Sequence, residues 1–281
     1  MPVNIVCCIK QVPDTAQVKI DPDTNTLIRS GVESICNPYD LVAAEAAVQL
    51  TEKYGGQVTV ISMGPPQAAV ALRECLSLGD HRAILLSDRA FAGADTLATS
   101  YTLAQSITAI AAAEPVHLVL CGKQAIDGDT AQTGPGVATR LGFCQLTYVS
   151  EIVEVDPEGG TITVRREVEG GSEVVEAKLP AMLTLELEMT TARYASLPEL
   201  VRSLRQEVEV WGASEIKAEP EYLGLTGSPT SVRQISSPPP RQGGPVYDVI
   251  AEKDKAVEDF LGVFFDKERD LLGELLGPDE G

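Results

Sequence analysis

The strongest constraint on the fold is an alternation of short apolar runs with helical patterns over residues 1–150. The apolar runs predict strands at Val3–Ile9, Gln57–Ser62, Ala83–Leu86 and Val116–Leu120. The helical patterns fall at Leu41–Lys53, Gln67–Leu78, Thr96–Ala112 and Ala131–Leu141. The predicted strands are continuously hydrophobic rather than alternating, which is typical of a sheet covered on both faces. We therefore predict a doubly wound α/β fold with a mostly parallel sheet, in which ligands bind beyond the carboxyl ends of the strands.

The pattern changes after the last of these helices. Val149–Val155 and Thr161–Val168 flank a turn-forming Asp-Pro-Glu-Gly-Gly stretch, and Val174–Ala177 follows a Gly-Gly pair. These runs predict an antiparallel extension of the sheet. Ala181–Leu187 then has the composition of one more core strand.

The C-terminal part combines a linker with a helical arm. Ser236–Pro240 and Gly243–Pro245 have the composition of a linker. From about Asp248 a helical pattern places apolar residues at helical spacing: Phe260, Leu261, Phe264, Phe265, Leu271, Leu272, Leu275 and Leu276. Such an arm must cover its apolar face, either on its own core or on another chain.

Composition and charge exclude several classes of protein. Hydrophobic residues make up 44% of the 281 residues, and no apolar run approaches the ~20 residues needed to span a bilayer. The formal charge of −19 disfavours nucleic acid and anionic membranes as partners. The six cysteines lack CxxC spacing, so we expect reduced, buried thiols in a cytoplasmic protein and no metal site. The N-terminus is too short and uncharged for a secretory signal.

The clearest local signal for binding runs from Cys121 to Gly136. A strand ends in glycine, a polar loop follows, and we predict a helix that opens with Asp129 or Thr130 as its N-cap. Free amides and the helix dipole at such a point favour phosphate oxygens. Thr130, Gln132 and Thr133 are further donors, and Gly128, Gly134 and Gly136 are expected to let a ligand approach. By chemistry alone this is an anion site or an ordinary connection.

Three other loops are expected at the same edge of the sheet. They are Cys8–Thr15, Cys36–Asp40 and Ser62–Pro66, with Asn37 or Asp40 as possible helix caps. Together with the glycine-rich loop they could enclose an adenosine, although each loop taken alone is better explained as a cap or a turn.

Several motifs in order resemble the beta subunit of electron transfer flavoproteins. They are Cys8-Ile9-Lys10-Gln11-Val12-Pro13-Asp14, Asn37-Pro38-Tyr39-Asp40, Gly122-Lys123-Gln124-Ala125-Ile126-Asp127-Gly128-Asp129, Leu179-Pro180-Ala181 and Arg193-Tyr194-Ala195-Ser196-Leu197-Pro198. The resemblance covers roughly Val3 to Val210. It implies a heterodimer whose alpha subunit carries a redox-active FAD, with AMP or FAD in the crevice of this chain.

The resemblance also implies a division of the chain. Residues 1–192 would form the nucleotide-binding domain, 193–205 a partner-recognition loop, 206–235 a connection, and 236–281 a linker and helical arm that packs on the alpha subunit. Leu197 matches the leucine that anchors on a partner dehydrogenase, with Arg193 and Tyr194 beside it. Ile9, the Asn37–Asp40 turn and Met63 would line the adenine pocket. The full cofactor-binding set is Ile9, Lys10, Asn37, Asp40, Met63, Asp95, Thr96, Cys121, Gly122, Lys123, Gln124, Asp127, Gly128, Asp129, Thr130, Gln132, Thr133 and Gly134.

The choice between AMP and FAD depends on Asp88–Tyr101, which follows the third predicted strand. Gly93, Asp95 and Thr96 predict a second capped helix start, and small residues such as Ala92 and Ala98 are expected to leave room for a flavin ring. The segment resembles bifurcating members, which hold FAD, more than housekeeping members, which hold structural AMP. By that resemblance the complex takes electrons from NADH and passes them to ferredoxin or flavodoxin and to a flavin-dependent dehydrogenase.

No catalytic side chain is expected in this reading, because a flavin carries the chemistry. The subunit would be redox-active only within its complex. Two rival interpretations are an AMP-holding structural subunit and an ATP-using ligase-like enzyme on the same type of sheet. The ligase interpretation lacks the GxxxxGK[ST] phosphate loop.

Overall fold

The computed structural model describes residues 1–14, 19–21, 26–28, 34–233, 250 and 253–267. The chain divides into two compact units, Met1–Ser236 and Ser237–Gly281.

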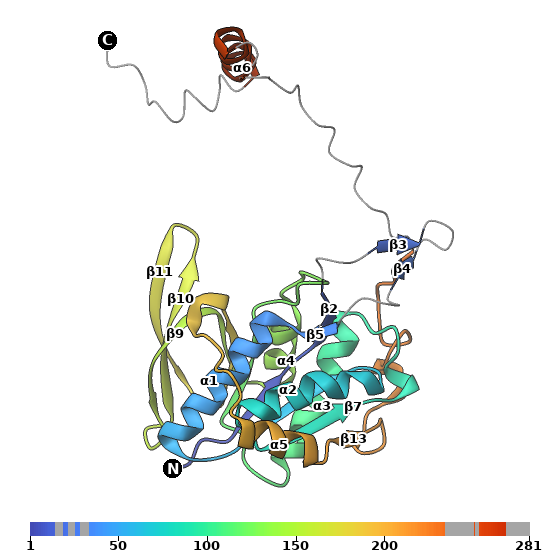
Figure 1. The fold of residues 1–281 in the computed structure, drawn as a ribbon. Helices are drawn as coiled ribbons and strands as arrows, with labels where there is room; N and C mark the ends of the chain where they lie inside the picture. Colours follow the sequence, from blue (N-terminus) through green and yellow to red (C-terminus); the bar gives the residue numbers. More distant parts are fainter. Residues whose placement is uncertain (15–18, 22–25, 29–33, 234–249, 251–252, 268–281) are drawn as a thin grey trace. The chain divides into compact units, whose positions relative to one another are not determined.

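The larger unit is built on one sheet, which contains nine strands within the described residues (Figure 1). The strands between β9 and β13 in spatial order are all parallel, whereas β10 and β11 add antiparallel pairs beyond β9. The predicted fold class is therefore confirmed. In spatial order the strands are β11 (Gly171–Lys178), β10 (Thr161–Val168), β9 (Cys144–Asp156), β12 (Ala181–Leu185), β8 (Leu118–Gly122), β1 (Ile5–Cys8), β6 (Val58–Met63), β7 (Arg82–Leu86) and β13 (Glu209–Trp211).

Helices cover both faces of the parallel part, as Figure 1 shows. The alternation of side chains along β1 explains how one strand serves two cores, because successive residues point to opposite faces. Ile5 and Cys7 belong to one apolar cluster, whereas Val6 and Cys8 belong to the other. The first cluster lies under α1 (Pro38–Tyr54) and α2 (Ala69–Leu78), and the second under α3 (Thr96–Ala111) and α4 (Thr133–Leu141).

The ends of α1 follow from its sequence. Pro38 occupies the first turn, where a missing N–H costs nothing. Gly55 follows the last turn with φ of 71°, a conformation that glycine adopts without strain. Between these ends the buried alanines let the helix lie close to the sheet.

Several short elements were not predicted from the sequence. The strand β13 lies in the expected connection 206–235 and pairs with β7. It was not predicted because three residues are too few to show a distinctive hydrophobic pattern. The remaining elements of this unit are β2 (Gln11–Pro13), β3 (Lys19–Asp21), β4 (Thr26–Ile28), β5 (Ser34–Cys36), the 3₁₀ turns η2 (Pro66–Ala68), η3 (Arg89–Phe91), η4 (Leu187–Met189) and η5 (Pro220–Tyr222), and helix α5 (Leu197–Arg205).

The smaller unit contains one described helix, α6 (Lys253–Lys267). The predicted helical arm is present there, although its expected start near Asp248 lies outside the described residues. The predicted linker stretches and the four C-terminal leucines also lie outside them. No helix in the described part of the chain is long and apolar enough to cross a bilayer.

The order of the strands identifies where a ligand site belongs. From β1 the chain moves to β6 and β7 on one side, and then crosses to β8 on the other side of β1. This reversal makes the carboxyl ends of β1 and β8 the topological switch point, where a doubly wound sheet opens a crevice.

Candidate functional site

Asp40, in the first turn of α1, joins the two strands at the switch point. Its carboxylate accepts hydrogen bonds from the backbone N–H groups of Lys10 and Gly122, each at 2.8 Å. Burial raises the pKa of Asp40 to about 7, although these hydrogen bonds favour the charged form. The carboxylate thus holds the loops after β1 and β8 together.

Asn37 holds the glycine-rich loop at Gln124 and Ile126, shortly after the Gly122 contact of Asp40. It is fully buried, its side-chain amide donates to the carbonyl oxygen of Gln124 at 2.9 Å, and its side-chain oxygen accepts from the N–H of Ile126 at 3.2 Å. Asn37 is the N-cap residue of α1, but its side chain makes no capping bond. The expected capping role of the Asn37 and Asp40 side chains is wrong, because both are used on loops that lie far away in the chain.

Lys10 and Asp127 link the same two loops from outside. The Lys10 Nζ lies 2.7 and 2.8 Å from the two Asp127 carboxylate oxygens, and the pair is largely exposed. This ion pair compensates the charge of Lys10, a residue that the family resemblance implied to lie at the nucleotide.

Lys123 is engaged in a similar way. Its Nζ lies 2.8 Å from a Glu186 carboxylate oxygen and 5.6 Å from the ring centres of Tyr39 and Tyr148. The hydrogen bond to Glu186 raises the pKa of Lys123. Glu186 and Tyr148 were missed in the sequence, where nothing in their local pattern distinguishes them.

The start of α4 differs from the prediction. The N-cap is Gln132, and the first helical residue is Thr133. Asp129 and Ala131 have φ of 53°, so the chain turns out of helical geometry before the helix begins. The predicted cap at Asp129 or Thr130 is therefore wrong. Asp129 instead accepts a hydrogen bond from the Gln124 side chain, and Thr130 is exposed beside the first turn.

The glycines of this segment have different roles. A Cβ on Gly128 would meet nothing within 4 Å, so this backbone is open. A Cβ on Gly134 would lie 2.6 Å from the Thr184 side chain and 3.1 Å from the Cys121 Sγ, and one on Gly136 would lie 2.8 Å from the Ser100 side chain. Gly134 and Gly136 therefore let α4 pack on the protein, whereas we expected them to admit a ligand.

The start of α3 lies beside the start of α4. Asp95 caps α3 as predicted, accepting from the N–H groups of Leu97 at 2.9 Å and Ala98 at 3.1 Å. The Thr96 hydroxyl donates to the Gln132 side-chain oxygen at 3.1 Å. Two helix N-termini thus meet at the carboxyl edge of the sheet, which concentrates positive dipole ends there.

A segment from later in the chain covers part of this edge. Thr230 donates to the Asp95 carboxylate from its hydroxyl at 2.8 Å and its N–H at 3.2 Å. A Cβ on Gly93 would lie 2.6 Å from the Leu225 side chain, and Ala98 is buried. The space that we predicted for a flavin ring at Gly93 and Ala98 is thus occupied by protein in this structure. Sequence reasoning missed this segment because no local pattern marks it.

Ile9 and Met63 mark the ends of neighbouring strands, β1 and β6. Ile9 is buried and its N–H donates to the Ile61 carbonyl at 2.9 Å, whereas Met63 is half-buried. The Ser62 hydroxyl, next to Met63, is fully buried and has no hydrogen-bond partner among the described residues.

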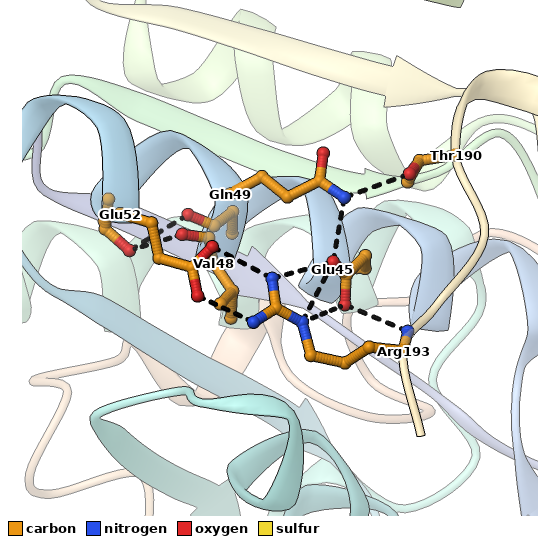
Figure 2. A network of polar contacts seen from close by, with 8 residues as sticks. Glu45, Val48, Gln49, Glu52, Thr190 and Arg193 are labelled. Carbon is orange, nitrogen blue, oxygen red and sulfur yellow. Dashed lines mark hydrogen bonds and ion pairs between the residues drawn. The ribbon is translucent and has the colours of Figure 1, made fainter. Parts of the chain in front are cut away.

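The predicted recognition segment forms helix α5, which starts at Leu197 with Ser196 as its N-cap. Leu197 is 73% exposed and Tyr194 fully exposed, as a docking surface requires. Arg193 behaves differently, because its side chain pairs with Glu45 and Glu52 of α1 (Figure 2). The Arg193 side chain therefore forms its ion pairs within this chain.

The cysteines and histidines support the fold. Five of the six cysteines are buried, as expected, and Cys144 is exposed. His81 accepts from the N–H of Val58 at 3.1 Å, and His117 accepts from the N–H of Asn4 at 3.0 Å. Both imidazoles therefore hold backbone at strand starts, His81 at β6 and His117 just before β1.

Comparison with known proteins gives a consistent result. The electron transfer flavoprotein domain model matches residues 24–216. Protein FixA of Azotobacter vinelandii is 51% identical over 240 residues, covering 85% of each chain. The electron transfer flavoprotein subunit beta of Clostridium acetobutylicum is 51% identical, covering 88% of this chain and 92% of that one. The corresponding subunit of Megasphaera elsdenii is 45% identical, covering 92% and 96%.

The fold and these similarities agree over most of the chain. We conclude that the chain belongs to the electron transfer flavoprotein family, as a beta subunit.

Proposed function

We propose that this beta subunit binds FAD in the crevice at the switch point and, with its alpha subunit, divides electrons from NADH between two acceptors. One acceptor is ferredoxin or flavodoxin, and the other is a flavin-dependent dehydrogenase such as an acyl-CoA dehydrogenase. The observation that carries the proposal is the meeting of two helix starts through Thr96 and Gln132. One helix start is able to hold a pyrophosphate, and a second start beside it adds donors for the part of FAD beyond the pyrophosphate.

The adenine half would lie over Ile9, the Asn37–Asp40 turn and Met63. Ile9 and Met63 stand at the carboxyl ends of β1 and β6, and the Asn37–Asp40 turn opens α1. Asn37 and Asp40 act mainly on the protein, since they hold the loop after β8 in place.

The phosphates would be held at the start of α4, chiefly by backbone amides. Lys10 and Lys123 are each paired with a carboxylate, so their charges are already compensated. The first-turn amides of α4 have no partner within the helix and supply the positive end of its dipole. Thr130 and Gln132 are exposed donors beside them, and Gly128 leaves the backbone open.

The flavin supplies the hydride and single-electron chemistry when bound. The residues of this chain bind it, orient it and set its surroundings. Asp95 fixes the start of α3, and Thr96 ties that start to α4, so both helices keep one spacing.

AMP is the second candidate, and one observation favours it. Leu225 fills the space beside Gly93, so a ring placed there requires this side chain to move. AMP makes no such demand, because it ends at the phosphate. An ATP-using ligase, by contrast, finds no support in the family to which the chain belongs.

Nucleotide content of the purified alpha–beta complex tests the proposal. Denaturation followed by chromatography of the released nucleotides should give two FAD per heterodimer. One FAD with one AMP would contradict the proposal and establish the second candidate. A Leu225→Ala variant serves as a further test, since extra space beside Gly93 should increase FAD retention and leave AMP retention unchanged.

A further inference from the structure

We propose that Arg193 is a positioning residue, which clamps the chain before α5 onto α1 and so sets the orientation of the exposed face of α5. This inference rests on the proposed function only in treating α5 as the surface that a partner dehydrogenase recognises. It replaces the expectation that Arg193 itself contacts the partner.

The contacts of Arg193 form a closed network within the chain, drawn in Figure 2. Its Nε and Nη2 donate to the two Glu45 carboxylate oxygens at 2.9 to 3.1 Å, and its backbone N–H donates to the same carboxylate at 3.1 Å. Its Nη1 and Nη2 donate to Glu52 at 2.6 and 3.0 Å. All three guanidinium nitrogens are therefore engaged.

A second link ties the same segment to α1. The Gln49 side-chain amide donates to Glu45 at 2.8 Å and to the Thr190 hydroxyl at 3.1 Å. Between Thr190 and Ser196 the backbone forms no helix or strand, so nothing periodic holds this stretch in place. Side chains from α1 supply that restraint.

Burial makes the clamp strong. The Glu45 side chain is only 3% exposed, and a buried carboxylate is costly unless it is paired and hydrogen-bonded. Glu52 lies on the same helix, and both carboxylates raise the pKa of Arg193 by favouring its charged form. Displacing Arg193 would leave Glu45 buried without its counter-charge, which explains why the segment stays on α1.

The far end of α5 has its own anchors on a different helix. Arg202 donates to the Leu76 carbonyl at 2.7 Å, and Arg73 donates to the Ser203 and Gln206 carbonyls at 2.9 and 3.0 Å. Helix α5 is thus fixed to α2 at its carboxyl end and to α1 just before its amino end. Loss of the Arg193 anchor frees mainly the end that carries Leu197.

Helix α1, with its N-cap residue Asn37, carries both the Arg193 contacts and the side chains that hold the nucleotide loops. Glu45 lies five residues after Asp40 in α1, which is about 7.5 Å along a helix. One rigid helix therefore holds the crevice at its start and the recognition segment one to two turns later. The geometry gives α5 a fixed position relative to the crevice.

Spin-label mobility on α5 in the intact heterodimer tests the clamp directly. A nitroxide is attached at Leu200→Cys, one turn into α5, in a Cys144→Ser background, because Cys144 is the exposed thiol of the described residues. Arg193→Ala should shorten the rotational correlation time at least twofold. Arg193→Lys should give an intermediate value, because an ammonium replaces the bidentate fork by a point charge. Unchanged mobility in both variants would overturn the proposal.

A matched control and a kinetic measurement complete the test. Arg165→Ala removes a surface ion pair with Glu151 on the antiparallel extension and should change nothing. With an acyl-CoA dehydrogenase as the electron partner, Arg193→Ala should raise KM about tenfold, change kcat less than twofold and leave nucleotide content unaltered. A raised KM without altered mobility would mean direct contact with the partner and would overturn the proposal.

The outcomes separate this proposal from the function of α5. Increased mobility with an unchanged KM would keep the clamp and exclude α5 as the recognition surface. Where Arg193→Ala does not fold, Arg193→Lys and Glu52→Gln decide the question, since both retain part of the network. Wild-type mobility in both of these variants would refute the clamp.

Discussion

Asp40 shows how a single side chain organises the crevice. It lies 82 positions before Gly122 in the chain, yet its carboxylate accepts both from Gly122 at the end of β8 and from Lys10 in the loop after β1. Two backbone donors aimed at one buried group require an acceptor on each oxygen. A carboxylate meets this requirement in its charged form, and an amide does not.

The raised pKa of Asp40 predicts how stability depends on pH. A carboxyl whose pKa rises from 3.8 to about 7 on folding binds more protons in the folded state, so its contribution to stability falls as pH rises through this window. Relative to an Asp40→Asn variant, the wild-type free energy of unfolding should fall by roughly 2–3 kcal/mol between pH 5 and pH 8. Urea titrations of both proteins at several pH values measure the two free energies of unfolding. A difference between them that does not change with pH would contradict the raised pKa of Asp40.

Gly128, in the loop after β8, and Gly134, in the first turn of α4, provide a matched pair of glycines. Gly134→Ala should lower the free energy of unfolding by about 1–3 kcal/mol, because its Cβ would lie 2.6 Å from Thr184 in a packed interior. Gly128→Ala should change it by less than about 0.5 kcal/mol, because its Cβ meets nothing within 4 Å. Thermal unfolding of both variants checks this order, and equal effects would contradict the packing role of Gly134.

Helix α5 is anchored to the protein on one side and exposes apolar side chains on the other. Its polar side bonds to α2, while Leu197, Leu200 and Leu204 remain exposed at helical spacing. Exposed apolar side chains in one row indicate an interaction surface rather than a core. That the partner is a dehydrogenase is a proposal based on the family resemblance.

Leu197→Ala should weaken the partner interaction without destabilising the subunit. Truncating an exposed anchor typically costs about 2 kcal/mol of binding, or roughly thirtyfold in KM for an acyl-CoA dehydrogenase. Flavin content and thermal stability should be unchanged, since the side chain is 73% exposed. Val174→Ala, another exposed apolar truncation on β11, is the control. Equal KM values for the two variants would remove Leu197 from the interface.

For the molecule as a whole, the division into two units matters most. The buried apolar clusters of the larger unit include no residue beyond Leu223 among those described. Helix α6 belongs to the other unit and exposes Phe260 and Leu261. That this arm packs on the alpha subunit, as the family resemblance implies, remains a prediction.

Deletion of residues after Arg233 tests the role of the arm. The shortened chain should unfold within about 0.5 kcal/mol of the full chain, because both apolar clusters remain. It should fail to co-elute with the alpha subunit in size-exclusion chromatography, whereas the full chain should co-elute. A shortened chain that still forms the heterodimer would show that the arm is dispensable for assembly.

Much of this protein could be predicted from its sequence. Hydrophobic periodicity is a local property, so it identified the covering helices, the antiparallel extension and the parallel strands other than the three-residue β13. The polar loops after β1 and β8, and the Asp95 cap, were found for the same reason. Errors at the start of α4 arose because Asp129 and Ala131 adopt positive φ, which their residue types only rarely do.

Contacts between distant parts of the chain required the tertiary structure. Asn37 and Asp40 have the composition of helix caps, but their side chains bond to Gln124, 87 residues away, and to Lys10 and Gly122, 30 and 82 residues away. Arg193 has no local feature that separates a partner contact from a clamp, and Glu45 lies 148 positions from it. Gly134 and Leu225 likewise acquire their roles from neighbours across the fold. Sequence pattern determines which elements form, because periodicity is short-range, whereas packing determines what each polar side chain holds.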